Sequence, residues 1–143
     1  MAEYKTHIQE GILLNANESS LNVDQDRMNE ILEEISKLSL NRYPDTTCQS
    51  LHALYGKIVN VPAKWILSGN GSDQMLGFLI QYYVQNQKVL YTLSPDFSMY
   101  DYYAEINHAK VLRYKTNLDG TFDVDDFILK GLKNRVDMIL FSN

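Results

Sequence analysis

The fold of this chain is decided by the stretch Ser68-Gly69-Asn70-Gly71-Ser72-Asp73, which lies between two apolar segments. The segment before it, Trp65-Ile66-Leu67, predicts a short buried strand, and residues 75–84 after it predict a helix. The two glycines allow a sharp turn and remove Cβ atoms from the path of a ligand. Ser72 and Asp73 place oxygen-bearing side chains at the helix start, where backbone amides lack partners. Such a turn can hold a phosphate through free N–H groups and the helix dipole, or it can be a tight turn with an N-cap and no ligand.

The composition indicates an ordinary globular protein and excludes several classes of partner. The chain has 143 residues, of which 45% are hydrophobic and 22% are charged, and its net charge is -5 at pH 7. A negative protein does not attract nucleic acid or an anionic membrane surface, so neither is expected. No apolar run approaches the roughly 20 residues of a membrane helix, and the N-terminus lacks a secretory signal. Because Cys48 is the single cysteine, no internal disulfide can form, and we expect a cytoplasmic protein.

The first part of the chain predicts an extended arm followed by helices. Residues 1–21 show no regular pattern and are interpreted as an N-terminal arm, and residues 22–62 as a helical segment. Apolar residues recur at helical spacing over residues 28–38, with Asn22 as the expected N-cap in a capping box. A second, shorter helix is expected to end at Gly56 as its C-terminal cap.

Residues 63–143 predict an alternation of strands and helices. Strands are expected at 88–91, 110–114 and 136–141, and helices at 75–84, 97–107 and 123–133. This alternation is typical of a parallel sheet covered by helices on both faces. Apolar residues surround the helix at 75–84 almost completely, so we expect it to be buried on more than one side. The prediction is an α/β fold with an incomplete, mostly parallel sheet and flanking helices; a front portion of a larger protein is favoured over a small complete domain.

Other kinds of site find little support in the sequence. The histidines His7, His52 and His108 lack the spacing of metal ligands, so no metal site is expected. A dinucleotide site would need a third glycine where Gln74 stands.

Four motifs stand in an order that is specific to one family. They are Leu14-Asn15-Ala16-Asn17-Glu18, Arg42-Tyr43-Pro44-Asp45, Gly69-Asn70-Gly71-Ser72-Asp73 and Pro95-Asp96-Phe97-Ser98-Met99-Tyr100. In the order and approximate spacing of these motifs, the chain resembles the histidinol-phosphate aminotransferases, which are fold-type I pyridoxal-phosphate enzymes. The resemblance implies that residues 63–143 begin a large cofactor-binding domain of aspartate-aminotransferase-like fold. It also implies that residues 22–62 border the small domain.

The resemblance assigns cofactor roles to five residues. It implies that Gly71, Ser72 and Asp73 hold the phosphate of pyridoxal 5'-phosphate. Tyr100 corresponds to the aromatic residue that stacks on the pyridine ring, although its helical position also fits ordinary core packing. Tyr43 corresponds to the tyrosine that reaches the phosphate of a neighbouring subunit's cofactor, and its alternative role is an aromatic wedge before a proline.

The substrate side of the site is less well matched. Asn17 lies in the arm segment that borders the substrate in the family, but Glu18 is followed here by Ser-Ser-Leu instead of Asn-Pro-Tyr. The family implies an amino donor and a keto acceptor as small-molecule partners, and a homodimer.

No catalytic residue is expected within this chain. The family's lysine, which forms a Schiff base with the cofactor, lies beyond residue 143 in relatives. Ser36-Lys37 is similar to the family's Ser-Lys pair but precedes the phosphate turn, so it is rejected. We therefore expect the parent protein to be an aminotransferase and this chain alone to be inactive. The alternative is a non-catalytic truncated fragment or a partner-binding α/β module.

Overall fold

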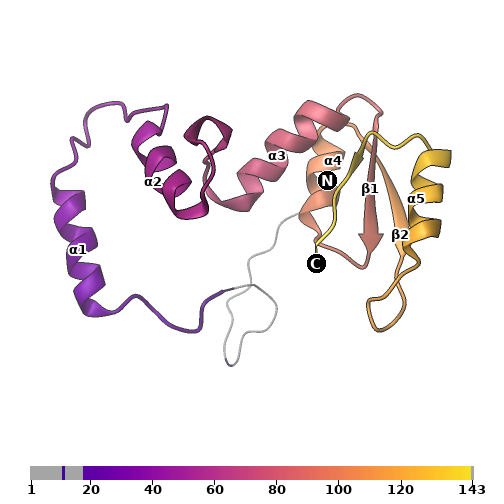
Figure 1. Cartoon of the computed structure of the whole chain (residues 1–143), viewed down its shortest axis with the longest axis horizontal. Helices are drawn as coiled ribbons and strands as arrows, with labels where there is room; N and C mark the ends of the chain where they lie inside the picture. Colours follow the sequence, from indigo (N-terminus) through magenta and orange to yellow (C-terminus); the bar gives the residue numbers. More distant parts are fainter. Residues whose placement is uncertain (1–10, 12–17, 143) are drawn as a thin grey trace. The chain divides into compact units, whose positions relative to one another are not determined.

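The structure is a computed structural model that describes residue 11 and residues 18–142. The described residues divide into two compact units, one within residues 3–51 and one within residues 52–143 (Figure 1). The predicted arm at residues 1–21 lies largely outside the described part, and the expected borders of a small and a large domain stay a prediction.

The first unit contains α1, Gln25–Ser36, which confirms the predicted amphipathic helix. Its N-cap is Asp24, whose carboxylate accepts a hydrogen bond from the amide of Arg27 at 2.9 Å. The prediction of Asn22 as the cap was wrong, because the Asn22 side chain accepts instead from the amide of Val23. The capping carboxylate thus lies directly before the helix, where the free amides are.

The second helix, α2, covers Gln49–Val59 and continues past the glycine that was expected to end it. It ends at Asn60, which has a φ of 54°, and the amide of Val61 donates to the carbonyl of Gly56 at 2.9 Å. This six-to-one bond around a left-handed residue is a Schellman motif, in which asparagine can replace glycine. Gly56 is required for a different reason: a Cβ there would lie 2.6 Å from the carbonyl oxygen of Val61.

The α/β unit confirms the predicted alternation of strands and helices. Its elements are η1 (Ala63–Trp65), α3 (Gly71–Val84), β1 (Val89–Ser94), α4 (Met99–Ile106), β2 (Lys110–Lys115), α5 (Val124–Lys133) and β3 (Met138–Ile139). The strands form a parallel sheet in the order β2-β1-β3. Val89 of β1 lies opposite Lys110 of β2, and Leu90 of β1 lies opposite Met138 of β3.

The central strand β1 has helices on both of its faces, as the sequence predicted. Leu90 is fully buried in a cluster with side chains of α3 and α4, whereas Tyr91 packs with Phe127 of α5. The Tyr91 and Phe127 rings are stacked, with centroids 4.3 Å apart. Because successive side chains of a strand point to opposite faces, this alternation places α3 and α4 on one side and α5 on the other (Figure 1).

Two expectations about burial were wrong. Residues 65–67 are not a strand: Trp65 ends the short 3-10 helix, and Trp65 and Leu67 are 73% and 71% exposed. Helix α3 buries Ile80 and Val84 completely but leaves Tyr82 75% exposed, so among the described residues it is covered on one side only. None of the described helices combines the length and apolar character needed to cross a bilayer.

Candidate functional site

The candidate site is built around the turn that begins α3. Gly71 has a φ of 72°, a left-handed conformation that glycine adopts at no steric cost, and its amide donates to the carbonyl of Gly69 at 3.1 Å. The amide of Asn70 donates to Oε1 of Gln74 at 2.7 Å, which fixes the turn against the first turn of the helix. Residues 69–74 are all exposed, and the side chains of Met75 and Gln74 lie against Gly69, where a Cβ would be 2.2 Å from Cε of Met75 and 2.7 Å from Oε1 of Gln74.

The start of α3 fits an anion. The Asn70 side chain makes no capping hydrogen bond, and the amides of Ser72 and Asp73 have no acceptor among the described residues. A Cβ at Gly71 would meet nothing within 4 Å, so the approach to these amides is open. Free amides at the positive end of a helix are the donors that bind phosphate groups in many proteins.

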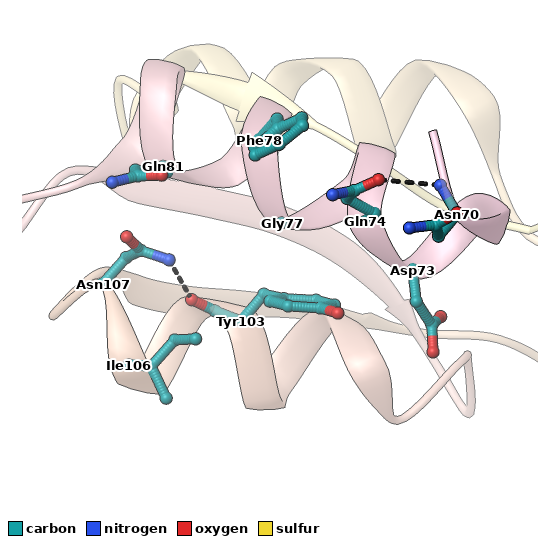
Figure 2. Close-up of a pocket in the computed structure, with 9 residues that line it drawn as sticks. All are labelled: Asn70, Asp73, Gln74, Gly77, Phe78, Gln81, Tyr103, Ile106 and Asn107. Atoms are coloured by element: carbon teal, nitrogen blue, oxygen red, sulfur yellow. Dashed lines mark hydrogen bonds between the residues drawn. The ribbon is translucent and has the colours of Figure 1, made fainter. Parts of the chain in front are cut away.

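A groove of about 510 Å³ lies beside the turn, between α3 and α4 (Figure 2). Most of its polar lining consists of carboxamides, and the lining residues are Asn70, Asp73, Gln74, Gly77, Phe78, Gln81, Tyr103, Ile106 and Asn107. Among them, Asp73 is the one residue that the sequence had assigned to the site. The groove was missed, although Gln74, Gly77 and Gln81 recur at helical spacing and could have indicated a polar stripe on α3.

The Tyr103 ring lies against the backbone of α3 in this groove. A Cβ at Gly77 would be 3.0 Å from Cε1 of Tyr103, so the glycine makes room for the ring. Figure 2 shows the Asp73 side chain pointing from α3 toward α4. Burial raises the pKa of the Tyr103 hydroxyl, and the negative charge of Asp73 adds to this effect.

Tyr100 lies on α4 in the core shared with α3 and β1. Its side chain is 6% exposed and packs with fully buried Ile80 and Leu90. The ring contacts Phe97 edge to face, with centroids 5.7 Å apart. This environment is the packing alternative that the sequence left open, and contact with a cofactor ring stays a prediction.

A carboxylate organises the carboxyl end of the sheet beside Tyr100. Asp96 accepts hydrogen bonds from the buried Thr92 hydroxyl at 3.2 Å and from the amide of Phe97 at 2.7 Å. The amide of Ser142 donates to both Asp96 oxygens, at 3.2 and 3.3 Å, and the Ser142 and Tyr100 hydroxyls are 3.0 Å apart. The network joins β1, α4 and the segment after β3 at the sheet edge where ligands of open α/β sheets bind.

The two remaining predicted residues lie outside the described α/β unit. Tyr43 belongs to the first unit, where its side chain is fully exposed, and Asn17 lies outside the described residues. Across residues 18–142, no group of three or more His, Cys, Asp or Glu side chains could hold a metal ion.

Comparisons with known proteins identify the family. The family model described as aminotransferase class I and II matches residues 9–143. The histidinol-phosphate aminotransferase of Clostridium kluyveri is 36% identical over 132 residues, which cover 92% of this chain and 38% of the relative. That of Thermococcus kodakarensis is 31% identical over 122 residues, which cover 85% of this chain and 36% of the relative. The chain thus spans well under half the length of these curated relatives.

Solved structures support the same fold. A histidinol-phosphate aminotransferase from Sinorhizobium meliloti, in complex with pyridoxal-5'-phosphate, superposes with a TM-score of 0.79 at 16% identity, covering 90% of this chain and 34% of that one. The enzyme from Clostridium acetobutylicum gives a TM-score of 0.65 at 20% identity, covering 81% of this chain and 32% of that one. These matches confirm the predicted fold class and the resemblance to histidinol-phosphate aminotransferases. Because the family model covers nearly the whole chain, the protein belongs to the class I and II aminotransferase family.

Proposed function

We propose that this chain contributes the phosphate-binding part of a pyridoxal-phosphate-dependent aminotransferase similar to histidinol-phosphate aminotransferase. The observation that carries the proposal is the open start of α3, where the amides of Ser72 and Asp73 have no acceptor within the part of the chain that the structure describes. Together with the conformation of Gly71, they provide donors for the cofactor phosphate. When bound, pyridoxal 5'-phosphate supplies the electron sink for amino transfer.

The chain's own groups bind and orient; they do not move protons. Ser72 adds a hydroxyl donor to the amides at the phosphate, and the Asp73 carboxylate is directed toward α4. Tyr100 is the proposed contact for the pyridine ring, and its hydroxyl is held by Ser142. Because no group in this part of the family's fold acts as the catalytic base, we expect no transamination by residues 1–143 alone.

The substrates and assembly follow from the relatives. The proposed reaction transfers an amino group between an amino acid and a keto compound, with histidinol phosphate as the leading substrate. Another aminotransferase, or a related phosphate-bearing decarboxylase, is the next candidate within the superfamily. We further propose a cytoplasmic homodimer in which Tyr43 reaches the neighbour's phosphate and Asn17 borders the substrate. The full exposure of Tyr43 in its unit leaves its ring available for such a contact.

A non-catalytic, partner-binding module is the alternative from a different class. It is favoured by the apolar side chains that α3 leaves uncovered in the described structure, with Phe78 49% and Tyr82 75% exposed. Patches of this kind commonly mark binding surfaces.

The test uses two ligands that differ only in the phosphate. Pyridoxamine 5'-phosphate and pyridoxamine are each titrated into the 15N-labelled chain, since neither has an aldehyde that reacts with surface lysines. We expect the phosphorylated compound alone to shift the backbone amide signals of Gly71, Ser72 and Asp73. Equal shifts from both compounds, or shifts that avoid these three amides, would return the turn to an ordinary helix start.

A further inference from the structure

We propose that His52 is a positioning residue for the anion-binding turn and that it acts through Ser68. The inference rests on the proposed function, because the turn is treated as a phosphate site. Nε2 of His52 lies 2.9 Å from Oγ of Ser68, and the pair is partly buried. The bond therefore joins α2 to the residue directly before Gly69, where the chain enters the turn.

The same side of α2 packs on the segment that leads to the turn. Gly56 follows His52 by four residues, so both lie on one side of the helix. A Cβ at Gly56 would be 2.6 Å from the carbonyl oxygen of Val61 and 3.3 Å from Cδ1 of Ile66. Helix α2 approaches this segment too closely to move independently of it. His52 extends the support by one helical turn, to Ser68.

The entry to the turn is packed by the side chains of Met75 and Gln74 at Gly69 but has few hydrogen bonds. The amide of Ile66 donates to the carbonyl of Ala63 at 3.1 Å, but Leu67 is 71% exposed and contributes little packing. Within the described part of the chain, the bond from Ser68 to His52 is the one side-chain hydrogen bond that residues 66–69 make. Without it, residues 66–69 lose their side-chain link to α2 and could shift across the open start of α3, where a phosphate would bind. The geometry of the anion site thus depends on a side chain that does not touch the anion.

The experiment separates the order of the turn from binding. In the 143-residue chain, 15N relaxation of Gly69, Asn70 and Gly71 is measured without ligand, and inorganic phosphate is then titrated. We expect His52→Ala to increase the mobility of these amides and to weaken phosphate binding about 3- to 10-fold, the effect of one lost neutral hydrogen bond. His52→Gln, which can still bond to Ser68, should restore part of both losses.

Two further variants keep the test decisive. Ser68→Ala removes the same bond from the other side, so it should match His52→Ala, and the double variant should be no worse than either single one. Ser68→Ala also provides the test if His52→Ala does not fold. Gln49→Ala, an exposed position without a recorded side-chain bond on the first turn of α2, is the control and should change neither quantity.

The possible results distinguish this inference from the proposed function. If the unchanged chain does not bind phosphate at the α3 amides, the proposed function fails, while increased mobility in His52→Ala still supports the positioning role. If His52→Ala lowers only the melting temperature and leaves the mobility of the turn and phosphate affinity unchanged, the positioning role is wrong.

Discussion

Replacing Gly71 by alanine tests whether the left-handed turn is required for anion binding. Gly71 has a φ of 72°, and a Cβ there would meet no atom within 4 Å, so the substitution causes no clash. Its whole cost comes from holding an L-residue in the left-handed region, about 1–2 kcal/mol. The variant can keep the left-handed φ and lose stability, or it can change its φ. A changed φ would redirect the amides of Ser72 and Asp73.

The chain offers a matched control at Gly120. It has a φ of 83°, and a Cβ there would also meet nothing within 4 Å. Gly120 lies in the turn between β2 and α5, where Thr121 bonds to Asp119, and it is not part of the candidate site. Gly120→Ala should therefore lose about the same 1–2 kcal/mol of folding free energy while leaving phosphate binding intact.

Two measurements on each variant decide the matter. Urea denaturation gives the free energy of unfolding, and titration with pyridoxamine 5'-phosphate gives the affinity. We expect both variants to lose similar stability, about 1–2 kcal/mol, and only Gly71→Ala to lose affinity, by roughly tenfold. Gly71→Asn should recover part of both, because asparagine visits the left-handed region more readily. If Gly71→Ala binds as well as Gly120→Ala does, the argument that this conformation aims the amides is refuted.

Three other substitutions test the electrostatics of the α/β unit. Asp126→Asn should lower the pKa of the Tyr114 hydroxyl, which a 2.7 Å hydrogen bond to Asp126 raises from 10.0 to about 12, and 13C NMR of the tyrosine Cζ would follow it. Because folding raises this pKa, the contribution of neutral Tyr114 to the free energy of unfolding is complete below pH 10 and is lost toward pH 12. In that window, the free energy of unfolding of Asp126→Asn should therefore depend less on pH than that of the unchanged chain. Asp96→Asn should cost about 1–3 kcal/mol in urea denaturation, since a carboxylate with three donors loses part of its acceptor capacity. Asp101→Asn, which breaks an exposed ion pair with Arg113, should cost no more than about 1 kcal/mol, and equal losses would contradict the role of the Asp96 network.

Local sequence signals predicted those elements whose determinants are local. A helix was predicted at residues 123–133, and the structure shows α5 there with Asp123 as its N-cap, which accepts from the amide of Asp126 at 2.9 Å. A strand was predicted at residues 88–91, and the structure shows β1 at Val89–Ser94, with side chains that alternate between two buried clusters. Four motifs in order were enough to identify the family, because each motif constrains the spacing of the others.

The errors occurred where neighbours in space decide the outcome. Gly56 was assigned to a helix end because glycine is common there, yet the structure needs it for a close approach of α2 to Val61. The sequence does not show which of these two reasons for a glycine applies. The burial of α3 was overestimated because an apolar helix shows what it could bury, while actual burial depends on which elements pack against it. Similarly, the His52–Ser68 bond spans 16 residues and has no local pattern.

An acidic chain can still hold an anion at the start of α3, because the repulsion from its net charge and the attraction of the helix amides act over different distances. The net charge of -5 acts over the whole surface, and at physiological ionic strength its field is screened within about 8 Å. Amide donors act within hydrogen-bond distance, and the dipole effect is confined to the first turn. The nearest acid in sequence, Asp73, has its carboxylate directed toward α4, where it raises the pKa of Tyr103. Local geometry would therefore outweigh total charge at the proposed site, so a negative net charge that speaks against nucleic acid as a partner is compatible with a phosphate ligand.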